Sequence, residues 1–113
     1  MGEWVERYLA ADTDIRAPHL IDVEAAHAFR GLVLRGLLEP ARAREALAEV
    51  ELVRIARYPH TSFLDAIWAL RVNLSAYDAA YVALADALGA PLVSTDERLG
   101  RAPGLPVDVI TPW

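Results

Sequence analysis

The sequence contains no cysteine and no lysine, and each absence narrows the chemistry that is possible. Without cysteine, disulfides and thiolate metal sites are excluded. All 11 basic residues are arginine, which a GC-rich coding bias explains more simply than selection for phosphate binding does. There is also no apolar stretch of transmembrane length, and the N-terminal segment MGEWVERYLAAD is amphipathic and acidic, unlike a signal peptide. We therefore expect a soluble, cytoplasmic protein without a membrane partner.

Positive charge is scarce as well, because 16 acidic residues stand against 11 basic ones and the net charge is −5. This balance argues against a surface that attracts nucleic acid everywhere. It is compatible with an enzyme whose acidic site holds divalent cations, since a bound metal inverts the local field. With 55% hydrophobic residues in 113, the chain can build one hydrophobic core, so we expect a single domain over residues 1–113.

Helical and extended patterns alternate along the chain, which predicts an α/β class with a mainly parallel sheet. An apolar central strand is expected in such a sheet, yet nothing before Trp4 can supply one, which indicates that the chain starts late. Thr61 or Ser62 is expected to cap the fourth helix. We expect helices at 3–11, 19–35, 40–50, 63–72 and 75–89, a helical turn at 97–100, and extended segments at 15–18, 52–56, 90–94 and 106–110.

Three carboxylates stand at positions that favour a site, and each also has an ordinary structural interpretation. Asp78 follows Ser75 in a pattern close to a capping box, and taken alone the capping role is favoured. Asp96 follows an apolar strand and precedes a helical turn, so a ligand role and an N-cap role are equally supported. Glu24 lies beside an apolar helix face, either at its solvated edge or paired with a cation. Asp22 points elsewhere and is expected at the surface.

Taken together, these three carboxylates predict a site for Mg²⁺ or Mn²⁺, because hard oxygen ligands without cysteine or clustered histidine suit those ions. The three histidines lack metal-ligand spacing. Trp4 and Trp68 are better explained as core or dimer-interface residues than as base-stacking platforms. Phosphate contacts could come from several arginines, although a solvated face is the better interpretation for most of them: Arg30, Arg35, Arg42, Arg44, Arg54, Arg57 and Arg98.

The segment 74–99, LSAYDAAYVALADALGAPLVSTDERL, resembles the signature of the PIN-domain family, and segment 17–24 resembles the family's entry to its second helix. The resemblance to its VapC-type toxins implies a three-layer sandwich with a parallel sheet flanked by helices. It implies an Mg²⁺- or Mn²⁺-dependent endoribonuclease in which Glu24, Asp78 and Asp96 bind metal and water attacks phosphorus, with the Thr95 hydroxyl beside them. It further implies a homodimer, an RNA substrate and a cognate antitoxin that lays a helix or tail into the site groove.

One departure from the family pattern is the absence of its first, central strand, which ends in a metal-binding Asp. Asp12 and Asp14 follow a predicted helix, so neither takes that place. A start codon assigned too far downstream, a truncated chain and a degenerate gene are the alternatives, and retention of the three other carboxylates favours the first. An inactive PIN-fold module that dimerises or binds an antitoxin is the alternative function. A response-regulator receiver is disfavoured because the chain lacks lysine.

Overall fold

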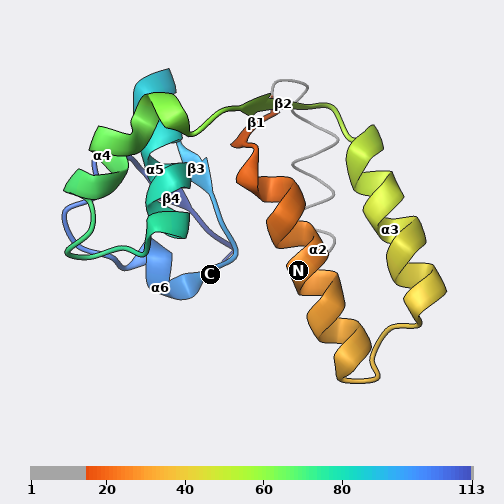
Figure 1. The fold of residues 1–113 in the computed structure, drawn as a ribbon. Coiled ribbons are helices and arrows are strands. Elements are labelled where there is room, and N and C mark those ends of the chain that lie inside the picture. Colours follow the sequence, from red (N-terminus) through yellow and green to blue (C-terminus); the bar gives the residue numbers. More distant parts are fainter. Residues whose placement is uncertain (1–14, 113) are drawn as a thin grey trace.

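The computed structural model describes residues 15–112, which alternate between helices and short parallel strands (Figure 1). The elements are β1 (Ile15–Pro18), α2 (Leu20–Leu34), α3 (Pro40–Leu52), β2 (Ile55–Tyr58), a 3-10 turn η1 (Thr61–Phe63), α4 (Leu64–Ala69), α5 (Ala76–Leu88), β3 (Leu92–Val93), α6 (Glu97–Gly100) and β4 (Val109–Ile110). The expected helix at 3–11 lies outside the described residues.

The first half of the described chain is a helical hairpin closed by a strand pair. β1 pairs with β2 in parallel, with Ile15 opposite Ile55 and Pro18 opposite Tyr58. The connection between these parallel strands is made by α2 and α3, which pack side by side and project away from the rest of the molecule (Figure 1). Pro40 opens α3 at a position where its missing N–H costs nothing.

The second half is built around α5, whose buried face is the core of the described molecule. Six residues of this helix between positions 79 and 85 are buried, and one of them, Val82, is fully buried. Ser75 caps the helix by accepting a hydrogen bond from the Asp78 backbone N–H at 3.1 Å. Gly89 ends it in the left-handed conformation at φ 63°, which glycine adopts without steric cost.

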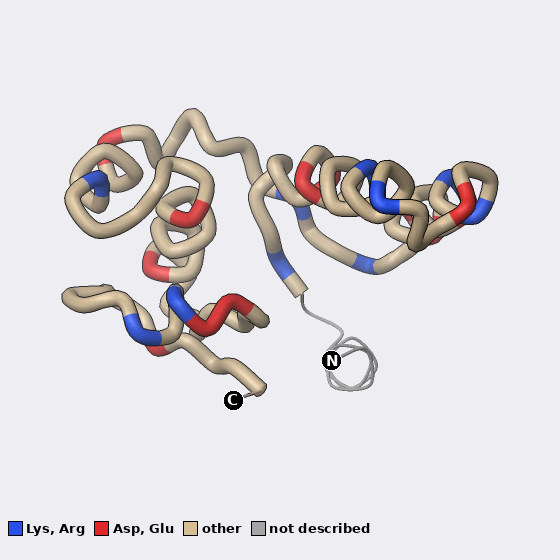
Figure 2. Tube along the Cα trace, turned by 90° about the horizontal axis from the view of Figure 1, so that it is seen from below, with Lys and Arg blue, Asp and Glu red and all other residues tan. Residues whose placement is uncertain are grey.

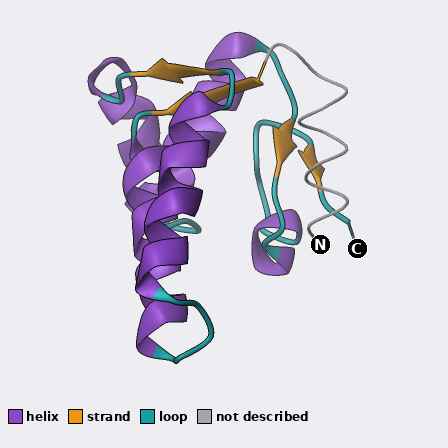
Figure 3. Ribbon diagram, turned by 90° about the vertical axis from the view of Figure 1, so that its right-hand side faces the viewer, coloured by secondary structure: helices purple, strands orange, loops and turns teal. Residues whose placement is uncertain are grey.

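The strands form two separate pairs rather than one continuous sheet. β1 pairs only with β2, and β3 pairs in parallel only with β4, as far as the described residues go. Figure 3 shows the two pairs apart from each other. α5 packs against both β1 and β3, so a single helix supports both sheets. The α/β class with parallel strands is therefore confirmed, while the sheet is divided in two.

Several expected boundaries need correction. The strand expected at 52–56 begins three residues later, because α3 continues to Leu52 and pairing with β1 sets the strand at Ile55–Tyr58. The fourth helix is shorter than expected and is preceded by the 3-10 turn. Neither Thr61 nor Ser62 caps it through a side chain, since the residues at the two cap positions are His60 and Phe63.

Candidate functional site

A cleft of about 770 Å³ lies between the two sheets, with β1 along one side and β3 along the other. Its floor includes Leu84, Ala85 and Leu88 of α5. Glu24, Asp78, Thr95 and Asp96 all line this cleft, although they come from three different places in the fold: α2, α5 and the turn after β3. The position is the one that open α/β sheets favour for ligands, because β1 and β3 both end there and polar residues follow each strand end.

Asp96 is held by a compact turn at the end of β3. The Ser94 hydroxyl accepts a hydrogen bond from the Asp96 backbone N–H at 3.0 Å. One oxygen of the Asp96 carboxylate accepts from the Arg98 backbone N–H at 2.9 Å, so Asp96 is the N-cap of α6. The capping interpretation is thus confirmed, and because the side chain also lines the cleft, the cap fixes the direction in which the carboxylate points.

Asp78 is placed by the first turn of α5. Its backbone N–H is bound by the Ser75 hydroxyl, so Ser75 is the cap and the Asp78 carboxylate is left to face the cleft. A carboxylate in the first turn is also favoured by the partial positive charge at a helix N-terminus. Asp78 is half-buried. The side-chain cap of the helix is supplied by Ser75 rather than by Asp78.

Glu24, on the second turn of α2, lies against the hydroxyl of Tyr81 from α5. Burial, the hydrogen bond with the Glu24 carboxylate and the negative charges of Glu24, Asp22 and Asp78 together raise the pKa of Tyr81 well above its usual range. Tyr81 therefore stays protonated and can act as a donor toward Glu24. Glu24 is half-buried and lines the cleft.

The side chains that could bind a metal in the cleft carry carboxylate and hydroxyl oxygens. Such oxygen ligands suit a hard divalent cation. The spacing does not yet suit one ion. Within residues 15–112, no three Asp, Glu, His or Cys side chains lie close enough together to share a metal. Glu24, Asp78 and Asp96 share a cleft, and an ion bound by all three requires them to approach one another.

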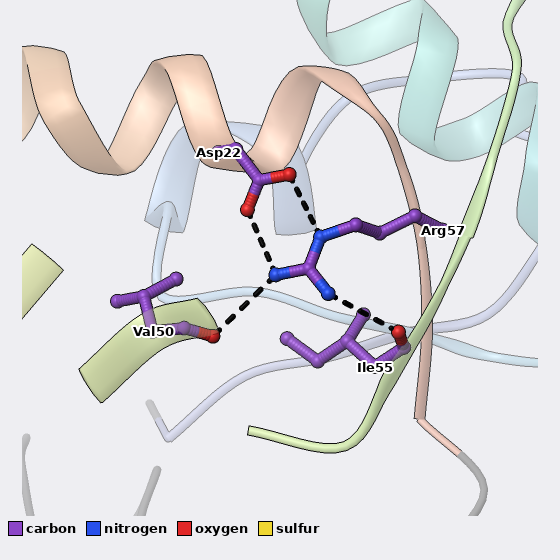
Figure 4. A network of polar contacts seen from close by, with 4 residues as sticks. All are labelled: Asp22, Val50, Ile55 and Arg57. Carbon is purple, nitrogen blue, oxygen red and sulfur yellow. Dashed lines mark hydrogen bonds and ion pairs between the residues drawn. The ribbon is translucent and has the colours of Figure 1, made fainter. Parts of the chain in front are cut away.

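Asp22 and Arg57 form a second polar cluster on the other side of α2 (Figure 4). The Arg57 guanidinium binds both carboxylate oxygens of Asp22, at 2.7 and 2.8 Å, and it also donates to the backbone carbonyls of Val50 and Ile55 at 3.4 and 3.3 Å. This arrangement lowers the pKa of Asp22 and raises that of Arg57. Asp22 is therefore an ion-paired residue rather than a plain surface one, and Arg57 joins α2, α3 and β2 instead of facing a phosphate.

The remaining arginines of residues 15–112 do not form a basic groove. Acidic and basic positions are interspersed along α2 and α3 (Figure 2), and Arg42 lies 3.3 Å from Glu49 and 3.6 Å from Glu45. Arg98 is exposed beside Asp96, at 3.8 Å. Arg16, which the sequence did not single out, lines the cleft from the middle of β1.

Trp68 is neither a core residue nor part of the cleft. Its side chain is 67% exposed on α4, and the Arg71 guanidinium lies 4.7 Å from the ring centroid. The core interpretation of Trp68 is wrong, because α4 is a short surface helix that presents this side chain outward. Trp4 lies outside the described residues.

Two cleft residues escaped the sequence reasoning. Tyr81 stands three residues after Asp78, and this spacing places two side chains on one helix face. Ser94 stands two residues before Asp96, the spacing of a hydroxyl that binds a nearby backbone N–H. Both spacings are present in the sequence, but neither indicates a site residue until the carboxylates are known to line one cleft.

Comparison with known proteins places this architecture in a family. The sequence model of the PIN domain family matches residues 2–105 of the chain. The chain belongs to the PIN-domain family. It is 43% identical to ribonuclease VapC1 of Mycobacterium tuberculosis over 106 residues, which are 93% of this chain and 80% of that protein. It is 45% identical to ribonuclease VapC9 of the same organism over 93 residues, 82% and 73% of the two chains, and 34% identical to ribonuclease VapC12 over 103 residues, 91% and 79%.

The relationship covers nearly the whole of this PIN domain, including both segments whose residues resemble the family pattern. The relatives that match over this length are named ribonucleases. Across residues 15–112, the helices are too short or too polar to cross a membrane.

Proposed function

We propose that this PIN domain is an endoribonuclease, the toxin of a VapBC-type pair, and that it hydrolyses RNA in the cytoplasm with Mg²⁺ or Mn²⁺. The observation that carries the proposal is the convergence of Glu24, Asp78 and Asp96 on one cleft. These are also the carboxylates at the positions of the family pattern. The VapC ribonucleases supply the reaction class, since they match over most of the chain.

In this proposal the three carboxylates hold the cation, and the Thr95 hydroxyl lies at the same edge to bind water or a phosphate oxygen. The cation, when bound, makes a water molecule more acidic and stabilises negative charge on the phosphate. The protein's own contribution is orientation. Ser75 fixes the first turn that carries Asp78, and Ser94 together with the α6 cap fixes Asp96. Tyr81, which stays protonated, holds Glu24.

The partners follow from the same family membership. We propose a cognate VapB antitoxin that occupies the cleft, a homodimer, and a single domain over residues 1–113. A surface suited to dimer contact lies on α4 and the residues after it, where Leu64, Trp68 and Val72 recur every four residues and are all exposed. Leu64 and Trp68 are four residues apart on α4 and share one helix face, and Val72 is exposed in the turn that follows.

A second candidate function has an observation of its own. Because no three acidic or histidine side chains in residues 15–112 are close enough to share an ion, the chain could be an inactive PIN-fold module that binds an antitoxin or dimerises. The two functions differ in whether the cleft binds a divalent cation at all.

The test is Mn²⁺ binding to the 113-residue chain by calorimetry, with Asp96→Asn as the variant and Asp86→Asn as the control. Asp86 is an exposed acidic residue at the far end of α5 and does not line the cleft. We expect binding that Asp96→Asn abolishes and Asp86→Asn leaves intact, and RNA cleavage that EDTA stops. Cleavage that persists in EDTA or in Asp96→Asn refutes the metal mechanism. No Mn²⁺ binding in any form of the chain supports the inactive module.

A further inference from the structure

Two aromatic side chains are exposed within residues 15–112, and one of them adjoins the carboxylates of the cleft. Trp68, 67% exposed, lies on α4 and does not line the cleft. Tyr77, 64% exposed, lies in the first turn of α5, directly before Asp78. An exposed aromatic ring is ordinary on a protein surface, so the position of the Tyr77 ring decides whether it has a function.

The helix face that carries Tyr77 is the face that forms the floor of the cleft. The residues of α5 that line the cleft are Asp78, Tyr81, Leu84, Ala85 and Leu88. At about 100° of rotation per residue, they span an arc of about 120°, and Tyr77 falls inside that arc. Helical side chains also lean toward the N-terminus of their helix. The Tyr77 ring therefore stands at the Asp78 end of the cleft and just outside it, which agrees with its exposure.

Tyr77 is held on a well-fixed turn. The Ser75 hydroxyl accepts a hydrogen bond from the Asp78 N–H at 3.1 Å, and the Ser75 carbonyl accepts one from the Ala79 N–H at 2.9 Å. These two bonds close the turn that contains Tyr77. A tyrosine side chain has only two torsion angles, so it loses little conformational entropy when another ring packs on it. The ring is therefore a preorganised flat surface next to a carboxylate.

Phosphate contacts alone give an RNA strand little affinity for this part of the surface. Glu24, Asp78 and Asp96 line the cleft together with a single arginine, Arg16, and Arg98 lies beside Asp96 at 3.8 Å. Affinity that comes from neutralised phosphates grows with the number of basic contacts, which is small here. Stacking on an aromatic ring involves no net charge. It is therefore a contact that an acidic site can offer to RNA without repelling it.

We propose that the Tyr77 ring is the surface on which one RNA base stacks while the neighbouring phosphate lies at the carboxylates, an inference that rests on the proposed function. Unpaired bases stack on tyrosine rings in this way, because every base has a flat face. A purine has a larger face than a pyrimidine, so stacking on Tyr77 favours a purine beside the scissile phosphate. Tyr77 is thus a specificity-determining residue that touches the substrate and takes no part in metal binding.

A protein partner fits this position less well than a base does. Tyr77 is the one large hydrophobic side chain of α5 that is exposed, and its neighbours Ser75 and Ala76 are small. Protein interfaces need a contiguous apolar patch, and such a patch lies on α4, where Leu64 and Trp68 share a face. A lone ring beside carboxylates instead matches a planar base whose phosphate reaches the cation proposed for the cleft.

The experiment uses the full 113-residue chain in EDTA with two uncharged probes, so that neither metal binding nor charge repulsion enters the measurement. The first probe is an adenine tetranucleotide with methylphosphonate linkages, and the second is the same backbone without bases. Nuclear magnetic resonance follows the ring protons of Tyr77 and Trp68 during each titration, because a stacked base shifts such protons upfield. Affinities are also measured for Tyr77→Phe, which keeps the ring, for Tyr77→Leu, which removes it, and for Trp68→Leu, the control at a similarly exposed aromatic residue.

We expect the adenine probe to shift the ring protons of Tyr77 and not those of Trp68, and Tyr77→Leu to weaken binding by about fivefold or more. Tyr77→Phe and Trp68→Leu should bind the probe as the wild type does. Unchanged affinity in Tyr77→Leu assigns the ring to a protein contact and overturns the inference. An equal loss in Trp68→Leu, equal binding of the probe without bases, or no binding by the wild-type chain also overturns it.

The nuclease proposal is judged separately, with ordinary RNA and Mn²⁺. No cleavage by the wild-type chain, while the adenine probe still stacks on Tyr77, refutes the nuclease proposal alone. Where the chain does cleave, Tyr77→Leu should lose the preference for a purine beside the cut and Tyr77→Phe should retain it. The same base preference in the wild type and in Tyr77→Leu overturns the inference and leaves the nuclease proposal standing.

Discussion

The cap at the start of α5 gives a sharp quantitative prediction, because it stabilises the helix that both sheets rest on. The Ser75 hydroxyl accepts a hydrogen bond from the Asp78 N–H at 3.1 Å. Replacing a capping serine by alanine typically destabilises a protein by about 1 kcal/mol. We therefore expect Ser75→Ala to lower the free energy of unfolding by about 1 kcal/mol, which corresponds to a fall in Tm of roughly 4–8 °C.

Chemical denaturation at constant pH measures this change, and two variants control it. Ser75→Asp should retain most of the stability, because aspartate caps helices as well as serine does. Ser62→Ala removes an exposed hydroxyl that caps no helix, so the free energy of unfolding should remain within a few tenths of a kcal/mol of the wild type. Equal losses for Ser75→Ala and Ser62→Ala, or no rescue by aspartate, would refute the reasoning.

Two further predictions concern ionisation. The pKa of Asp22 is lowered by Arg57, so the ion pair stabilises the fold fully above pH 3.8, and this stabilisation is lost as the pH falls through the lowered pKa. Thermal melts should therefore show a smaller loss of stability with falling pH in Asp22→Asn than in the wild type, and identical pH slopes would contradict this. The pKa of Tyr81 is raised above 10.0. Tyr81→Phe should therefore leave unchanged the phenolate absorbance that the protein develops just above pH 10. A loss of one quarter of that absorbance, the share of one of the four tyrosines, would show that Tyr81 ionises normally. Because its folded-state pKa is raised, Tyr81 supports the fold fully below pH 10, and this support declines as the pH rises further.

Local signals in the sequence predicted the helices well. Pro40 opens α3, Gly89 ends α5 and Ser75 caps it, and each effect depends on a single residue and its immediate neighbours. The strand at Ile55–Tyr58 was placed too early, because Leu52 reads as apolar in either a helix or a strand. Only pairing with β1, forty residues away, decides between them.

The candidate site shows the same division. The carboxylates that follow strand ends or begin a helix could be selected from local pattern, and they do line one cleft. The Asp22–Arg57 pair could not, because its partners are 35 residues apart and meet only when β1, which precedes α2, pairs with β2. The separation of the sheets was not predictable either, since each strand taken alone looks like part of a continuous parallel sheet.

The two strand pairs also set an order for folding. Ile15 pairs with Ile55 across forty residues, whereas Leu92 pairs with Val109 across seventeen. Closing the longer loop costs about 0.8 kcal/mol more in chain entropy, and it requires the turn between α2 and α3 as well. The segment from α4 to β4 should therefore condense first, with the β1–β2 pair docking onto α5 afterwards. Substitutions in the C-terminal half will then mainly slow folding, and those in β1 and β2 will mainly accelerate unfolding.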